Sequence, residues 1–163
     1  MHDDADSLFR TVRGYQQLNR RNGGLTPALE DYMEMIYRRC EVRGYARVGE
    51  IAGRLHVTPS SASKMVGKLA ALGYLQYEQR EVILLTDRGR EAGDFLLRRH
   101  RIIERFFRLL SAEDSLEETE LVEHSLRAST IRSLQILLDF FEKDTAAAAD
   151  FASFREHYPP AGG

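Results

Sequence analysis

The sequence predicts a mostly α-helical protein with a small β-hairpin, built as a winged helix-turn-helix unit followed by a second helical unit. Residues 25–90 read as helix, tight corner, helix and hairpin, and residues 91–157 read as a series of helices. The first order of elements is typical of winged helix-turn-helix domains. Residues 1–24 are predicted to be an N-terminal extension and linker, and residues 158–163 a disordered tail.

The first predicted helix begins in the stretch LTPALEDYMEMIYRRC, residues 25–40. Thr26 is a suitable N-cap, because its hydroxyl can accept from a backbone N–H of the first turn, and Pro27 suits the first helical position. Gly44 is the predicted stop, because glycine readily adopts the left-handed conformation that ends many helices. Apolar residues at helical spacing support the assignment: Leu29, Met33, Ile36, Tyr37 and Cys40.

The stretch VGEIAGRLHV predicts a short second helix, and PSSASKMVGKLAALG predicts a third, with Thr58 as N-cap and Gly73 as terminator. The stretch YLQYEQREVILLT alternates apolar and polar residues around a charged turn at 79–81, which predicts a β-hairpin, the wing. The expected buried face of the third helix consists of Met65, Val66, Leu69 and Leu72.

Thr86 is the predicted cap of a long helix that runs to about Leu110, and Gly89 and Gly93 weaken its first turns without ending it. Further helices are predicted at about 114–126, at 130–143 and within 146–157.

Composition excludes several classes of protein. The single cysteine, Cys40, allows no internal disulfide and no thiolate metal cluster within one chain, which favours a cytoplasmic setting. Apolar runs approaching about 18 residues are lacking, as is a signal-peptide pattern, so we expect neither a transmembrane span nor a membrane partner.

Charge is distributed unevenly along the chain. Residues 47–90 carry seven basic and four acidic side chains, net +3, whereas residues 91–163 carry nine basic and fourteen acidic side chains, net −5. A basic middle predicts an anionic partner, and an acidic C-terminal part is compatible with cation binding. Chance segregation of so few charges is the alternative.

The third helix has the residues of a major-groove reader. Small hydroxyls can approach base edges, lysine and arginine can neutralise phosphates, and a helix N-terminus itself attracts phosphate. We therefore predict binding to double-stranded DNA, although a winged helix used only for packing is the alternative. The predicted DNA-binding residues are Pro59, Ser60, Ser61, Ser63, Lys64, Lys68 and, in the wing, Arg80.

Three predicted helices carry polar side chains that packing does not require. These are Asp31 and Glu34 in the first helix, His100 and Glu104 in the long helix, and Glu120, Glu123 and His124 in the next. Each group has the helical spacing that lets side chains converge on one ion. Taken singly, each is more often a solvated helix face.

If these helices meet, two divalent ions could be held through a shared carboxylate by four of the carboxylates and both imidazoles: Asp31, Glu34, Glu120, Glu123, His100 and His124. A set rich in oxygen, with some imidazole and no sulfur, suits Mn(II) or Fe(II) better than Cu(I) or a closed structural zinc site. Zn(II) or Cd(II) could still bind.

Several stretches resemble the diphtheria-toxin-repressor family, and specifically its manganese transport regulator branch. They are TPALEDYMEMIY, GYARVGEIAGRLHVTPSSASKMVGKL, LTDRGREAG, RRHRIIERFF and ELVEHSL, which together span about residues 25–143. The resemblance implies a homodimeric, metal-activated transcriptional regulator whose second unit binds metal and dimerises. The ligands that it implies are Asp31, Glu34, His100, Glu120, Glu123 and His124.

The resemblance also informs the metal. Iron-responsive members typically have Met at the counterpart of Asp31 and Cys at that of Glu120, so two carboxylates here imply Mn(II), with two ions per subunit. Glu104 matches an accessory ligand position of iron-type members.

We therefore expect a Mn(II)-activated dimeric repressor of manganese uptake genes that binds a palindromic operator. The alternatives are a winged-helix regulator that senses Fe(II) or another effector, and a carboxylate-bridged di-metal enzyme. The helix-turn-helix and the lack of an obvious nucleophile or substrate-binding loop argue against an enzyme and against a small organic substrate.

Overall fold

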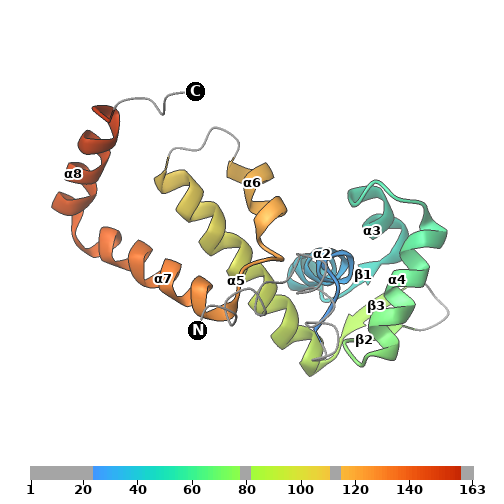
Figure 1. Cartoon of the computed structure of the whole chain (residues 1–163). Coiled ribbons are helices and arrows are strands. Elements are labelled where there is room, and N and C mark those ends of the chain that lie inside the picture. The colour runs from blue at the N-terminus through green and yellow to red at the C-terminus, as the bar shows by residue number, and fades with distance from the viewer. Residues whose placement is uncertain (1–23, 78–81, 111–114, 159–163) are drawn as a thin grey trace, which may run out of the picture. The chain divides into compact units, whose positions relative to one another are not determined.

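A computed structural model describes residues 24–77, 82–110 and 115–158, and divides the chain into two compact units, 1–97 and 98–163. The first unit contains α2 (Pro27–Arg43), β1 (Ala46–Arg47), α3 (Val48–Arg54), α4 (Pro59–Ala71), β2 (Leu75–Tyr77) and β3 (Val82–Leu85) (Figure 1). The helix α5 (Asp87–Leu109) begins in the first unit, and α6 (Ser115–Val122), α7 (Ala128–Lys143) and α8 (Thr145–Glu156) lie in the second. The predicted fold, mostly helical with a small sheet, is confirmed.

The ends of α2 and α4 are those that the sequence predicts. The hydroxyl of Thr26 accepts from the N–H of Leu29 at 3.3 Å, and the hydroxyl of Thr58 accepts from the N–H of Ser61 at 3.2 Å. Gly44 has a φ of 81°, and its N–H bonds to the carbonyl of Cys40, which closes α2 as a left-handed cap.

The sheet has three strands in the order β1-β3-β2, so the expected hairpin is part of a slightly larger structure. Both pairings are antiparallel, with Ala46 opposite Ile83 and Leu75 opposite Leu85. The sequence analysis missed β1, because two residues are too few to show an alternating pattern. The wing turn predicted at 79–81 lies outside the described residues, as do residues 1–23 and 159–163.

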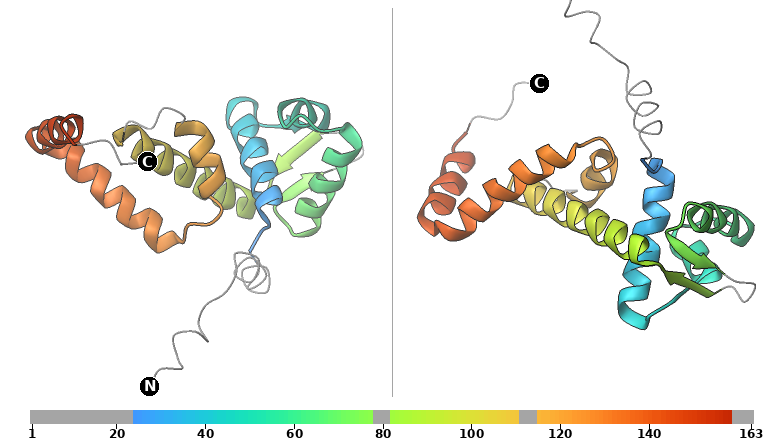
Figure 2. Two further views of the ribbon diagram at one scale, coloured as in Figure 1. Left: turned by 45° about the horizontal axis from the view of Figure 1, so that its top comes forward. Right: turned by 90° about the horizontal axis from the view of Figure 1, so that it is seen from below.

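Helices α2, α3 and α4 pack around this sheet (Figure 2). Met33, Ile36, Ile51, Leu69 and Ile83 are fully buried at the centre of the shared core. Of the face predicted for α4, Val66 and Leu69 are buried and Met65 is partly buried, whereas Leu72 is exposed. Leu72 is the C-cap that follows the end of α4 at Ala71, and its side chain is 45% exposed, so that part of the prediction was wrong.

Both glycines at the start of α5 lie where a side chain would collide with the first unit. A Cβ at Gly93 would come within 2.4 Å of the Tyr37 ring, and one at Gly89 within 2.0 Å of the Tyr74 carbonyl oxygen. Their low helix propensity is therefore offset by close packing of α5, which an alanine would prevent.

The second unit is held together by a few aromatic and aliphatic contacts. Phe141 of α7 and Phe151 of α8 lie with their ring centroids 5.3 Å apart, and Arg105 of α5 forms an ion pair with Glu142 of α7. Ile131 and Leu138 are buried along one side of α7. The helix predicted at about 114–126 is shorter than expected, since α6 ends at Val122. Among the described residues, no helix has both the length and the apolar character needed to cross a membrane.

Replacing Gly93 by alanine should lower the free energy of unfolding by about 1–3 kcal/mol, because the new methyl group would meet the fixed base of the Tyr37 ring. The matched control is Gly67→Ala in the middle of α4, where a Cβ would meet nothing within 4 Å. That control should raise the free energy of unfolding by about 0.5–1 kcal/mol. Urea unfolding measures both changes, and equal effects would contradict the close packing of α5.

Candidate nucleic-acid interface and metal ligands

The N-terminal half of α4 presents a polar surface to solvent. Pro59, Ser60, Ser61 and Lys64 are exposed, and Lys68 is exposed one turn later. Thr58 and Ser61 bond to each other through their hydroxyls at 2.9 Å, in addition to the backbone cap. The start of α4 therefore offers small hydroxyls and N–H groups of a helix N-terminus, which can donate to phosphate or to base edges.

Ser63 differs from the other predicted residues because its hydroxyl lies 3.1 Å from the hydroxyl of Tyr77 in β2. Both side chains are half-buried. This hydrogen bond joins α4 to the sheet, a contact of Ser63 that was not predicted from the sequence. The period-2 pattern places Tyr77 in a strand but does not indicate its partner. Arg80 lies outside the described residues.

Glu50 on α3 forms ion pairs with three arginines, a cluster that was not predicted from the sequence. Its carboxylate lies 2.5 Å from Arg39, 3.7 Å from Arg54 and 3.8 Å from Arg43. Arg39 and Arg43 belong to α2, so this carboxylate fixes the first helix of the helix-turn-helix to α2. The i,i+4 spacing of Glu50 and Arg54 is local to α3, but no spacing reveals the contacts with Arg43 and Arg39, which lie 7 and 11 residues before Glu50 on another helix.

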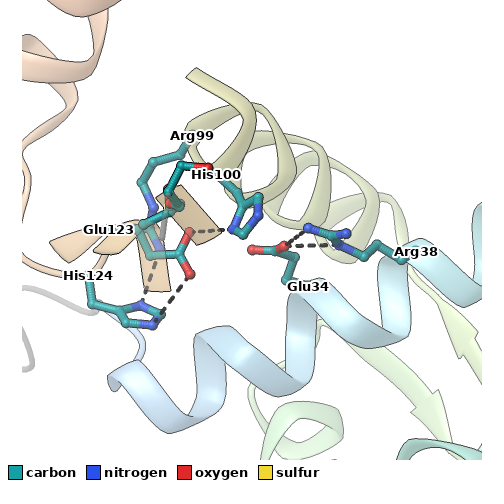
Figure 3. A network of polar contacts seen from close by, with 8 residues as sticks. Glu34, Arg38, Arg99, His100, Glu123 and His124 are labelled. Atoms are coloured by element: carbon teal, nitrogen blue, oxygen red, sulfur yellow. Dashed lines mark hydrogen bonds and ion pairs between the residues drawn. The ribbon is translucent and has the colours of Figure 1, made fainter. Parts of the chain in front are cut away.

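In the second unit, a buried carboxylate and a buried imidazole form a direct pair. Nδ1 of His100 on α5 lies 3.0 Å from Oε2 of Glu123, and the two residues are 6% and 4% exposed (Figure 3). An ionised carboxylate only accepts, so Nδ1 of His100 donates in this contact; when the ring is neutral, Nε2 then carries the lone pair. A histidine oriented in this way by a carboxylate is the form that binds a metal ion through its other nitrogen.

His124 lies on the other side of the same carboxylate, with its Nε2 3.7 Å from Oε1 of Glu123. The buried guanidinium of Arg99 lies 3.3 Å from Nδ1 of His124. Arginine only donates, so in this contact Nδ1 accepts. The structure thus brings His100, Glu123 and His124 together, with positive charge from Arg99 beside them.

The sequence analysis put Glu120, Glu123 and His124 on one helix, which is correct only for Glu120. Because α6 ends at Val122, Glu123 and His124 lie in the turn that follows. The N–H of Glu123 still bonds to the carbonyl of Thr119 at 2.9 Å, which keeps it in register with the helix. Glu120 is exposed, whereas Glu123 is buried.

The remaining predicted ligands lie on α2 in the first unit. Asp31 is exposed and Glu34 is 8% exposed. Arg38 donates to Oε1 of Glu34 from Nε at 3.0 Å and from Nη2 at 2.6 Å, one helical turn away (Figure 3). Glu104, on α5, likewise accepts from Arg108 at 2.6 Å.

Cys40 does not contribute to this chemistry. Burial raises the pKa of its thiol to about 11, although the positive charge of Arg90 partly opposes the shift. The thiol lies 3.9 Å from the carbonyl oxygen of Ile83 and belongs to the core of the first unit. At neutral pH it is therefore protonated, which is the form that binds metals poorly.

Two protein-family models match this chain, one over the part with the predicted DNA-binding residues and one over the part with His100, Glu123 and His124. Residues 24–82 match the family described as iron dependent repressor, N-terminal DNA binding domain, and residues 86–150 match the iron dependent repressor metal binding and dimerisation domain. The chain belongs to the iron dependent repressor family. The predicted resemblance to the diphtheria-toxin-repressor family, and to its manganese transport regulator branch, is confirmed.

Two relatives support the assignment. The chain is 39% identical to the HTH-type transcriptional regulator MntR of Bacillus subtilis, over 80% of this chain and 94% of that protein. It is 43% identical to MntR of Geobacillus kaustophilus, over 73% of this chain and 86% of that protein.

Solved structures of regulators share the fold. The metal-dependent transcriptional regulator MtsR is 30% identical with a TM-score of 0.64, and the manganese regulator SloR is 29% identical with a TM-score of 0.62. Each match covers 71% of this chain but only 55% of the solved chain. The iron dependent repressor family consists of metal-dependent transcriptional regulators, so the prediction that this chain is a repressor and not an enzyme is confirmed.

Replacing Lys64 by alanine should weaken DNA binding and lower the slope of log affinity against log salt by about 1, because one phosphate contact is lost. Lys143, exposed at the end of α7, is the matched control, and Lys143→Ala should leave affinity and slope unchanged. Fluorescence anisotropy over a salt series measures both. An unchanged slope for Lys64→Ala would contradict the assignment of α4 as the reading helix.

Proposed function

We propose that the chain is a Mn(II)-activated, homodimeric repressor of manganese uptake genes that binds a palindromic operator. The observation that carries this proposal is the donor chemistry: carboxylates at Asp31, Glu34, Glu120 and Glu123, imidazoles at His100 and His124, and no sulfur. Hard oxygen donors with some imidazole suit Mn(II) better than softer ions. Names of the relatives, MntR and manganese regulator, point to the same ion.

The six proposed ligands fit a divalent ion in their donor chemistry. Glu123 is a buried carboxylate between two imidazoles, and donation from Nδ1 of His100 to Glu123 would leave Nε2 of a neutral ring to face an ion. Four carboxylates and two imidazoles suffice for two ions per subunit that share a carboxylate. Asp31 and Glu34 of α2 complete the set in this proposal, so the ions would take ligands from both units.

Repulsion between carboxylates supplies the switch. Four carboxylates that share a site disfavour one another's ionised forms. Bound Mn(II) would supply the positive charge that removes this cost. The ligands of α2 and those of the second unit are then held together, which fixes the reading helices of a dimer at the spacing of two half-sites, about 34–36 Å. A coupling of roughly 5–150-fold in affinity is typical of such linkage.

A second copy of the chain is the proposed partner of α7. This helix buries Ile131 and Leu138 within the unit, yet Ile136, Leu137 and Phe140 are exposed. A helix that is apolar on more than one side is normally covered on each of them, and contiguous exposed apolar residues mark interaction surfaces. The matched dimerisation domain supports a second copy of this chain over another partner.

Titration of operator DNA with and without Mn(II) tests the metal switch, and Fe(II), Zn(II) and Cd(II) in parallel test its selectivity. We expect Mn(II) to raise the affinity of the unaltered chain by roughly 5–150-fold. Glu123→Ala should abolish the gain while the fold is kept. The control is Glu118→Ala, an exposed carboxylate on α6, which should keep the full gain. Equal affinity with and without every metal would contradict the proposed function.

Replacing Ile136 by glutamate should convert the dimer to a monomer, because a charge would have to be buried in the apolar contact. Ile136 is 60% exposed in the single chain, so the folded monomer tolerates the change. Val42→Glu, at a residue 73% exposed on α2, is the matched control and should leave the dimer intact. Sedimentation velocity gives the answer, and a dimeric Ile136→Glu protein would rule out this face of α7.

A further inference from the structure

The first turn of α5 is bonded to the end of the reading helix α4 through one arginine. Nη1 of Arg88 donates to the carbonyl oxygen of Leu72 at 2.8 Å, and Nη2 donates to the hydroxyl of Tyr74 at 3.2 Å. The guanidinium carbon also lies 4.4 Å from the centroid of the Tyr74 ring. Leu72 is the C-cap of α4, so its carbonyl has no partner within that helix. A cation at this end also interacts favourably with the helix dipole.

Thr86 and Gly89 make the same junction rigid from the backbone side. The N–H of Thr86 donates to the carbonyl of Tyr74 at 3.1 Å, and its hydroxyl lies 2.7 Å from the carbonyl of Gly73. The N–H of Gly89 donates to that hydroxyl at 3.0 Å. A Cβ at Gly89 would lie 2.0 Å from the carbonyl oxygen of Tyr74, so the two segments touch without an intervening side chain.

These contacts connect the DNA-reading helix to the helix that carries a proposed metal ligand. His100 follows Arg88 by twelve residues on α5, which is about 18 Å along a helix. The direction of α4 is thereby fixed relative to the first turn of α5.

We propose that Arg88 is a positioning residue for DNA recognition, which holds α4 to α5 so that metal binding on α5 controls the orientation of the reading helix. This inference rests on the proposed function. It assigns Arg88 a role through Leu72 and Tyr74, and none in direct contact with DNA.

The competing role for an exposed arginine near a reading helix is a phosphate contact. A lost phosphate contact weakens DNA binding equally with and without metal, and lowers the salt slope by about 1. A lost positioning contact acts only on the metal-bound state, because the metal-free state does not use the fixed orientation. Lysine separates the two roles, since it keeps the charge but lacks the planar fork that bonds Leu72 and Tyr74 together.

The experiment measures DNA affinity with and without Mn(II) for the full-length unaltered chain, Arg88→Ala, Arg88→Lys and the control Arg90→Ala. Arg90 is an exposed arginine two residues further along α5, 3.8 Å from Asp87. We expect the metal-induced gain to fall at least about threefold in both Arg88 variants and to be unchanged in Arg90→Ala. DNA affinity without metal, and Mn(II) affinity without DNA, should stay within about twofold of those of the unaltered chain.

Hydrogen exchange of the Gly73 and Tyr74 amides gives a readout that needs neither metal nor DNA. These amides bond to the carbonyls of Ala70 and Leu69 at the end of α4, and they should exchange faster in both Arg88 variants. If Mn(II) does not raise the DNA affinity of the unaltered chain, the proposed function fails. The exchange rates still show whether Arg88 holds the end of α4 to the first turn of α5.

Three results would overturn the proposal. One is a loss of affinity in Arg88→Ala that is equal with and without Mn(II) and is restored by lysine. Another is unchanged exchange of the two amides. The last is a lower melting temperature with an unchanged metal-induced gain, which would make Arg88 merely structural.

Discussion

The burial of Glu123 is the constraint on which the second unit depends. An ionised carboxylate that is 4% exposed must be surrounded by donors, because its transfer out of water otherwise costs several kcal/mol. His100 supplies a hydrogen bond at 3.0 Å, and His124 lies within 3.7 Å. Arg99 adds a fixed positive charge beside His124. Two consecutive residues of α5 therefore serve the same carboxylate, directly or through His124, and the chain must turn after α6 to bring Glu123 to them.

The winged unit depends on the close approach of α5 to two tyrosines. Tyr37 of α2 and Tyr74 before β2 both contact glycines of α5, so the start of α5 packs as part of that core. Because α4, the sheet and α5 share Tyr74 and Leu85, the orientation of the reading helix is set by nonlocal packing. The exposed lysines of α4 then remain available for DNA contacts.

Local signals accounted for most of what the sequence could predict. The caps at Thr26, Thr58 and Thr86, and the stop at Gly44, act within one turn, and each is found as predicted. The family could also be predicted from the sequence, because its motifs are contiguous. Contacts between distant segments could not be predicted. No spacing in the sequence encodes strand β1, the hydrogen bond between Ser63 and Tyr77, or the ion pairs of Arg39 and Arg43 with Glu50. The helix before Glu123 and His124 was predicted to be too long. It ends at Val122, although the N–H of Glu123 in the following turn still bonds to the carbonyl of Thr119.

The continuity of α5 decides where flexibility can lie. Residues 94–109 contain neither glycine nor proline, the usual causes of a sharp bend in a helix. Rotation of His100 relative to Gly89 would break backbone hydrogen bonds in the middle of a helix of 23 residues. In the proposed switch, the contacts that change are therefore those of side chains, the carboxylates and Arg88, rather than the backbone hydrogen bonds of α5.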